Sequence, residues 1–256
     1  MWFQAEVAGR FAREALAGGQ GEVCAAFRRS FYLRYPGERY ACVGDASLGR
    51  GPLNVLVAPF RLPAIGDRGS ISIERCVLWQ PPAIVPGSSM DAASLKRAAA
   101  GRAPGEGLGC LVAGAHNALS VHAQPALEAV DQWLAGNSLG AEAEALIGLG
   151  PGLTPSGDDY LGGVLVALRS LGRHPQAESL WRWLEPRLAQ RTSAISAAHL
   201  AAAAAGEAHE ALHACLKKLF RNEDSWNDVL SRLDSVGHCS GWDALAGAVA
   251  AARSCG

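Results

Sequence analysis

The chain has 256 residues, of which 49% are hydrophobic and 18% charged, and its formal net charge is -1. This composition supports one large domain or two packed subdomains with a sizeable core, and it lacks the basic field typical of nucleic-acid binding. No apolar run approaches the roughly 18 residues of a membrane span, and the first residues do not resemble a signal peptide, so we expect a cytoplasmic protein with no nucleic-acid and no membrane partner.

The first half reads as strands separated by Gly/Pro turns, after an N-terminal helix at residues 3–16. Strands are expected where Val, Ile and aromatic residues are enriched, at residues 39–43, 53–60, 70–79 and 108–113. Residues 1–124 are therefore predicted to form a strand-rich N-terminal subdomain.

From about residue 125 the sequence becomes alanine-rich, with apolar residues at the three- and four-residue spacing of helices. Helices are expected at residues 125–134, 141–146, 158–171, 176–190, 193–205, 207–220, 226–233 and 242–252. Residues 125–256 are predicted to form a helical bundle, so the fold class is α+β: a strand-rich half packed on helices, either as two subdomains or as one compact domain.

A segment dense in glycine and proline, residues 148–159, leads directly into one of these predicted helices. Glycines permit positive φ and close approach of a ligand, and backbone amides at a helix N-terminus attract anions. The segment is therefore a candidate anion-binding loop. The alternative is a tight turn with a capped helix, since Ser156 and Asp159 fit a variant of the capping box.

The pattern S-G-x-D-x-L-x-G occurs twice, at residues 156–163 and 240–247. In both copies the serine would cap a helix and the aspartate three residues later would complete the box. We expect the two junctions to be related by an approximate twofold pseudo-symmetry and to enclose a polar pocket. Asp158 aligns with Trp242, so capping leaves Asp158 unexplained and makes it the better chemical candidate.

Residues 148–163, with Gly237-His238-Cys239-Ser240-Gly241-Trp242-Asp243, resemble the AllH-type proteins. Residues 48–55 and 192–196 also match, and the likeness covers nearly the whole chain. Cys239 departs from the pattern, in which threonine is expected. The resemblance implies a subunit of a carbamoyltransferase that acts on oxamate or oxalurate and carbamoyl phosphate, together with other subunits of the complex.

The leading hypothesis is thus an enzyme or enzyme subunit that binds a small carboxylate or phosphate between the two halves. The catalytic candidates are Asp158 and His238. The substrate-binding candidates are Arg50, Asn54, Gly150, Gly152, Thr154, Ser156, Gly157, Asp159, Ser240 and Asp243. No metal ligands are assigned and no cofactor is required, apart from a divalent cation that Asp158 would bind.

Two alternatives come from other functional classes. One is a non-catalytic scaffold subunit whose loop binds a metabolite. The other is a zinc hydrolase, because His209-Glu210-Ala211-Leu212-His213 fits H-E-x-x-H on a predicted helix, with Glu223 or Asp234 as a third ligand. The pair His116-Asn117 is a further candidate for lining the pocket.

Overall fold

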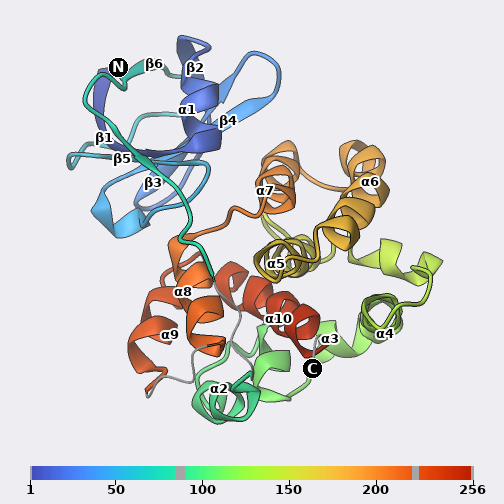
Figure 1. The fold of residues 1–256 in the computed structure, drawn as a ribbon. Helices are drawn as coiled ribbons and strands as arrows, with labels where there is room; N and C mark the ends of the chain where they lie inside the picture. Colours follow the sequence, from blue (N-terminus) through green and yellow to red (C-terminus); the bar gives the residue numbers. More distant parts are fainter. Residues whose placement is uncertain (1, 85–89, 221–224, 255–256) are drawn as a thin grey trace. The chain divides into compact units, whose positions relative to one another are not determined.

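The structure is a computed structural model that describes residues 2–84, 90–220 and 225–254. The chain divides into two compact units: Met1–Pro82 with Glu207–Glu210, and Ala83–Gly206 with Ala211–Gly256. The predicted α+β fold class is confirmed, because strands make up the first unit and helices the second (Figure 1). Residues 83–124 belong to the helical unit.

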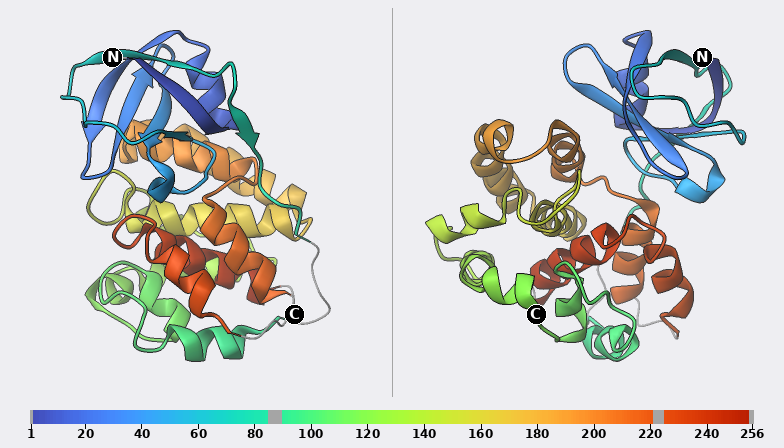
Figure 2. Two further views of the ribbon diagram at one scale, coloured as in Figure 1. Left: turned by 90° about the vertical axis from the view of Figure 1, so that its left-hand side faces the viewer. Right: turned by 180° about the vertical axis from the view of Figure 1, so that it is seen from behind.

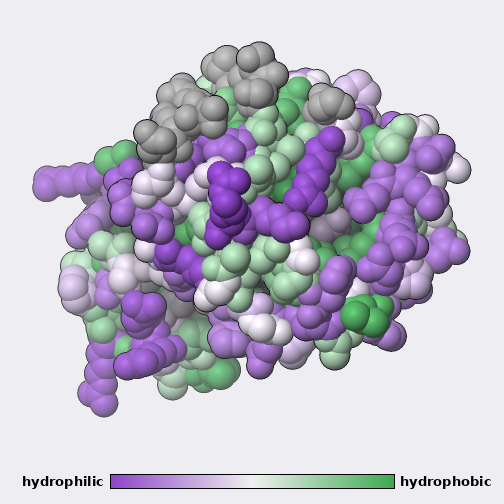
Figure 3. Space-filling model, turned by 90° about the horizontal axis from the view of Figure 1, so that it is seen from below, coloured by the Kyte–Doolittle hydropathy of each residue, from purple (hydrophilic) through white to green (hydrophobic). Residues whose placement is uncertain are grey.

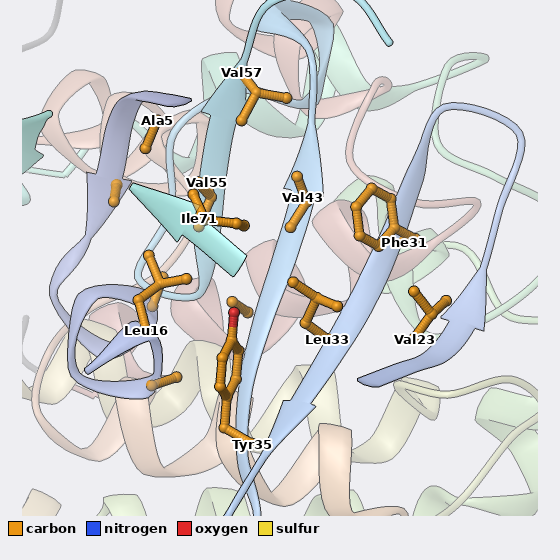
Figure 4. Packing of buried hydrophobic residues seen from close by; sticks show 14 residues of the cluster. Ala5, Leu16, Val23, Phe31, Leu33, Tyr35, Val43, Val55, Val57 and Ile71 are labelled. Carbon is orange, nitrogen blue, oxygen red and sulfur yellow. The ribbon is translucent and has the colours of Figure 1, made fainter. Parts of the chain in front are cut away.

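The first unit is a closed β-sheet. Its elements are β1 (Trp2–Gly9), α1 (Arg10–Leu16), β2 (Gln20–Ala26), β3 (Ser30–Tyr35), β4 (Arg39–Gly44), the 3₁₀-helix η1 (Ala46–Leu48), β5 (Asn54–Val57), β6 (Arg68–Ser72) and β7 (Val77–Trp79). The strand order is β5-β4-β3-β2-β6-β1-β7, and a further pairing of β5 with β1 closes the sheet into a barrel. Side chains such as Phe31, Leu33 and Val43 fill its core, together with Leu16 of α1 (Figure 4).

The N-terminal helix predicted at residues 3–16 is wrong over its first part, because β1 occupies Trp2–Gly9 and the helix covers only Arg10–Leu16. β1 pairs with β5, β6 and β7, so tertiary pairing overrides the local helical preference here. The predicted strand at 70–79 is divided between β6 and β7, and β2 and β3 were not predicted.

The segment Glu207–Glu210 completes the first unit, although more than a hundred residues separate it from the rest. Arg10 Nε donates to Glu207 Oε1 at 2.6 Å, and the Glu207 residue is only 8% exposed. Glu210 N donates to Arg50 O at 2.8 Å, and Arg50 N donates to Glu210 Oε1 at 2.8 Å. The loop around Arg50 is therefore the place where this segment binds.

The second unit is helical. Its elements are α2 (Ala92–Ala99), the 3₁₀-helix η2 (Gly109–Ala113), α3 (Ala118–His122), α4 (Gln124–Leu134), the 3₁₀-helix η3 (Ala141–Leu146), α5 (Ser156–Ser170), α6 (His174–Arg191), α7 (Ala194–Ala204), α8 (Glu210–Leu219, of which Glu210 belongs to the first unit), α9 (Asn227–Leu233) and α10 (Ser240–Arg253). The most extensive helix pair is α5 with α10, which lie side by side in both views of Figure 2.

The strand predicted at residues 108–113 is wrong, because this apolar run forms η2. A short buried run cannot be assigned by periodicity alone. Here the run packs on α10, and a Cβ added to Gly109 would lie 2.4 Å from Trp242 Cβ. Close packing on a helix therefore decides its conformation.

No helix among the described residues is both long and apolar enough to cross a membrane. The face shown in Figure 3 carries hydrophilic side chains interspersed with small apolar areas.

Candidate functional site at the paired starts of α5 and α10

The helices α5 and α10 cross at two glycines that occupy equivalent positions in the S-G-x-D-x-L-x-G repeat. A Cβ added to Gly163 would lie 1.8 Å from the carbonyl oxygen of Ala244, and one added to Gly247 would lie 1.9 Å from that of Tyr160. Tyr160 and Ala244 are themselves equivalent in the repeat. In each helix the glycine of the repeat therefore packs against the equivalent carbonyl group of the other helix, as the predicted pseudo-twofold relation requires.

The serines and aspartates of the two junctions are exchanged between the helices. The Ser156 hydroxyl hydrogen bonds to the Asp243 carboxyl, and the Ser240 hydroxyl to the Asp159 carboxyl. Thr154 Oγ1 lies 3.0 Å from Ser240 Oγ, so it joins the same network. The two junctions thus meet, as expected, in one polar cluster.

The predicted capping boxes are wrong. The N-cap of α5 is Pro155 and that of α10 is Cys239, and neither helix has a side-chain cap. Both helices begin at the serine of the repeat, which places this side chain inside the first turn and toward the partner helix. The serines therefore link two helices instead of ending one.

Asp243 is the buried carboxyl of this cluster with the most backbone contacts. It is 1% exposed, and its Oδ1 accepts hydrogen bonds from Leu108 N at 2.6 Å and Gly109 N at 2.7 Å. Burial raises the pKa of Asp243 to about 6, although the bonds from Ser156 and the two amides oppose this rise. The group therefore titrates close to neutral pH.

Asp159 is the corresponding carboxyl of the first junction. Burial raises its pKa well above the ordinary value, and the nearby charges of Asp243 and Asp158 raise it further, while the hydroxyls of Ser240 and Thr154 lower it. Its Oδ2 is buried and has no hydrogen-bond partner among the described residues. Asp159 and Asp243 therefore form a coupled pair in which one carboxyl holds a proton more firmly than the other.

Asp158, predicted as catalytic, is buried and accepts three hydrogen bonds. It is 2% exposed; Oδ1 accepts from Gly148 N at 2.8 Å, and Oδ2 accepts from Ser196 Oγ at 2.6 Å and from the Thr192 hydroxyl. Its side chain fixes the glycine-rich loop to the start of α7. Asp158 therefore has a structural role that the capping argument did not assign to it.

The glycine-rich loop is held at its ends and open in its middle. Gly148 has a φ of 74°, and a Cβ there would lie 2.0 Å from Arg191 O; Gly157 N donates to Leu149 O at 2.9 Å. Gly152 is exposed, and a Cβ there would meet no atom within 4 Å. Within the described residues no acceptor is found for the amides of Gly150, Gly152, Leu153 and Thr154. These amides are available to a ligand.

His238, the second catalytic candidate, precedes α10 on the surface. Its side chain is 84% exposed, and Nε2 lies 3.2 Å from Glu106 Oε2. Together with Cys239, these residues are the group of His, Cys, Asp and Glu side chains in the described part of the chain whose ligand atoms are close enough for one metal ion.

Arg50 and Asn54 lie in the first unit and serve the loop that binds Glu207–Glu210. Asn54 is 8% exposed, and its Nδ2 donates to Gly49 O at 3.0 Å. The Arg50 side chain is exposed, while its backbone pairs with Glu210. These contacts give both residues a structural role.

The H-E-x-x-H motif has a structural explanation in the same loop. His209 Nε2 lies 3.0 Å from Leu48 O, and Glu210 accepts from Arg50 N. Of the third-ligand candidates, Asp234 accepts hydrogen bonds from Arg102 and from Trp242 Nε1, and Glu223 lies outside the described residues. The geometry therefore does not favour a zinc hydrolase at this motif.

The neighbours His116 and Asn117 contact different parts of the helical unit. Asn117 caps α3 and its Nδ2 donates to Gly105 O at 3.0 Å and Gly107 O at 2.8 Å. His116 lines a different pocket, near Arg253. Asn117 therefore holds the loop that carries Glu106, a role that no local pattern in the sequence indicates.

A comparison with known protein families finds a match to a segment in the second half of the chain. The family described as oxamate carbamoyltransferase subunit AllH has a model that matches residues 146–252. The resemblance inferred from the sequence is confirmed over this segment, which contains both S-G-x-D junctions. No curated protein and no solved structure matches the chain.

Proposed function

We propose that the chain is a subunit of an oxamate carbamoyltransferase and that the paired starts of α5 and α10 bind its small anionic substrates. The observation that carries this proposal is the exchange of serine and aspartate between the two junctions, which forms one buried polar cluster inside the segment that matches the AllH family. Burial raises the pKa of both carboxyls of this cluster, Asp159 and Asp243, which suits the pair to proton transfer.

The anion would be held by the middle of the glycine-rich loop. The amides of Gly150, Gly152, Leu153 and Thr154 find no acceptor within the described residues, and they directly precede the positive end of α5. Oxamate and carbamoyl phosphate are both small anions of the size such a loop accommodates. The amides also suit the charge that develops on a transferring carbamoyl group.

The carboxyl pair would move the protons. In carbamoyl transfer, the amide nitrogen of oxamate forms a bond to the carbonyl carbon of carbamoyl phosphate and loses one proton, while the C–O bond to phosphate breaks. Asp243, with a pKa raised by burial to about 6, is mostly ionised at neutral pH and accepts the proton. Asp159, whose pKa burial raises well above its ordinary value, donates a proton to the departing phosphate oxygen. Transfer from Asp243 to Asp159 then restores the pair.

The test is phosphate-dependent cleavage of oxalurate, the reverse reaction, by the chain alone and with the products of its neighbouring genes. Asp243→Asn and Asp159→Asn should each lower turnover by about a hundredfold or more, since general acid–base catalysis contributes about that much. Both variants should still assemble with the partner subunits, as measured by size-exclusion chromatography.

The non-catalytic scaffold predicts a different outcome. In that case both asparagine variants would weaken metabolite binding to the chain, measured by calorimetry, but the assembled complex saturated with substrate would keep full turnover. If both asparagine variants kept full activity and unchanged metabolite binding, the α5–α10 cluster would take no part in the reaction.

A further inference from the structure

We propose that Glu106, His238 and Cys239 form a binding site for a Zn²⁺ ion at the rim of the α5–α10 junction. One ligand atom from each residue lies within 4.8 Å of the others, and this is the set of potential metal ligands that the described part of the chain brings together. The proposal concerns metal binding and stands independently of carbamoyl transfer.

The chemistry of the three side chains selects the kind of metal. A thiolate, an imidazole and a carboxylate are the ligands that Zn²⁺ combines in proteins, whereas Mg²⁺ and Ca²⁺ prefer oxygen ligands alone. Three protein ligands leave one tetrahedral position open for water or a small anion. The His238–Glu106 contact, 3.2 Å between Nε2 and Oε2, already holds two of the ligands at a distance that a shared cation would bridge.

The backbone on both sides of Glu106 is fixed by hydrogen bonds. Asn117 Nδ2 binds the carbonyl oxygens of Gly105 and Gly107, which flank Glu106. Asp243 then binds the amides of Leu108 and Gly109. The loop that carries Glu106 is thus anchored before and after this residue, although the side chain itself is 78% exposed.

The other two ligands are placed by the start of α10. Cys239 is the N-cap of this helix, and its carbonyl oxygen accepts from Asp243 N at 2.9 Å. His238 precedes it directly, after Gly237, which has a φ of 62°. Loop and helix start are therefore joined through Asp243, which brings the three ligands together without the metal.

Charge at the site favours a cation. The carboxyls of Asp243 and Glu106 act on Cys239 through their charge, and this negative charge attracts a divalent ion. A thiol that coordinates Zn²⁺ loses its proton. Cys239 stands where the AllH resemblance leads us to expect threonine, so the site is a property of this chain.

The experiment is a Zn²⁺ titration of the full, chelator-treated chain in competition with a chromophoric chelator. We expect one Zn²⁺ per chain, with an affinity that rises with pH because the thiol must lose a proton. Cys239→Thr and His238→Ala should weaken binding by about a hundredfold or more, the upper end of what loss of a supporting residue costs. Cys76→Ser, which alters another half-buried free cysteine, should bind as the unaltered chain does.

Co²⁺ in place of Zn²⁺ provides a direct readout of the sulfur ligand. The unaltered chain and Cys76→Ser should show a thiolate-to-cobalt charge-transfer band that Cys239→Thr lacks. Cys239→Thr restores the residue expected from the family, so it should retain its circular dichroism and thermal melting. Absence of saturable Zn²⁺ binding, equal affinity in Cys239→Thr, loss of binding in His209→Ala instead, or metal-dependent dimerisation would each overturn the proposal. Oxalurate cleavage plays no part in these measurements, so the two proposals can fail separately.

Discussion

Replacing Asp243 with asparagine should make the protein more stable above neutral pH, although the replaced carboxyl accepts two backbone hydrogen bonds. The pKa of Asp243 is raised from the ordinary value of 3.8 to about 6. A group with a raised folded-state pKa contributes its full stability below the unfolded value and loses it as the pH rises through the folded value. A rise of about two pKa units corresponds to about 3 kcal/mol.

Asparagine resembles the protonated carboxyl: its Oδ1 can still accept from Leu108 N and Gly109 N, but it carries no charge to desolvate. The free energy of unfolding of Asp243→Asn, minus that of the unaltered chain, should therefore increase by about 2.5 kcal/mol between pH 4 and pH 8, slightly less than the full amount because the unfolded carboxyl is already partly ionised at pH 4. Any constant difference between the two side chains cancels in this comparison.

The assay is urea unfolding followed by far-ultraviolet circular dichroism at several pH values, which reports mainly on the helical unit. Asp158→Ala, which removes a carboxyl bound by three donors, is the matched control and should be destabilising at both pH 6 and pH 8. A difference between Asp243→Asn and the unaltered chain that stays flat from pH 4 to pH 8, or that falls, would refute the account of Asp243 as a buried carboxyl with a raised pKa.

Three further predictions follow from the same geometry. Gly163→Ala and Gly247→Ala should each destabilise the helical unit by about 3 kcal/mol or more in urea unfolding, because the new Cβ would collide with a carbonyl oxygen. The control Gly162→Ala, whose Cβ would have ordinary contacts at 3.7 and 3.8 Å, should be neutral or slightly stabilising. Equal effects at Gly162 and Gly163 would contradict the close crossing of the two helices. Asp158→Asn should lower the free energy of unfolding by about 2–4 kcal/mol, because asparagine keeps only one of the two oxygens that accept hydrogen bonds. An unchanged melting temperature would contradict this structural role and favour a chemical role for Asp158. In the forward direction, the rate of carbamoyl transfer to oxamate, kcat/KM, should fall as the pH drops through about 6, where Asp243 takes up a proton. A constant rate from pH 8 to pH 5 would exclude Asp243 as the base.

The repeated S-G-x-D-x-L-x-G pattern was sufficient to predict the paired junctions, because the spacing of Ser, Asp and Gly on a helix fixes which side chains face one partner. It was not sufficient to assign Asp158 and Asp159. The capping argument uses local geometry alone, whereas Thr192 and Ser196, which bind Asp158, come from a distant part of the chain. Long-range partners of this kind leave no local signal.

Long-range contacts of this kind also explain why some secondary-structure elements were predicted wrongly. The run at residues 108–113 is apolar enough for a strand, and only its contact with Trp242 makes it a 3₁₀-helix. Similarly, His209 and Glu210 match a zinc motif by spacing, but their partners Leu48 and Arg50 lie about 160 residues away. The helices from residue 156 onward were predicted well, because their long apolar periodicity does not depend on such contacts.

The barrel is not encoded by one uninterrupted stretch of the gene. The chain leaves the first unit after Pro82, returns for Glu207–Glu210 and leaves again. A fragment ending at Pro82 would lack the carboxylate that binds Arg10 and the peptide that pairs with Arg50. Conversely, a fragment cut to the matched segment, residues 146–252, would carry this tetrapeptide without the strands that hold it. Expression of either half as an independent module therefore requires moving four residues from one to the other, for example by a linker that fuses them behind residue 82.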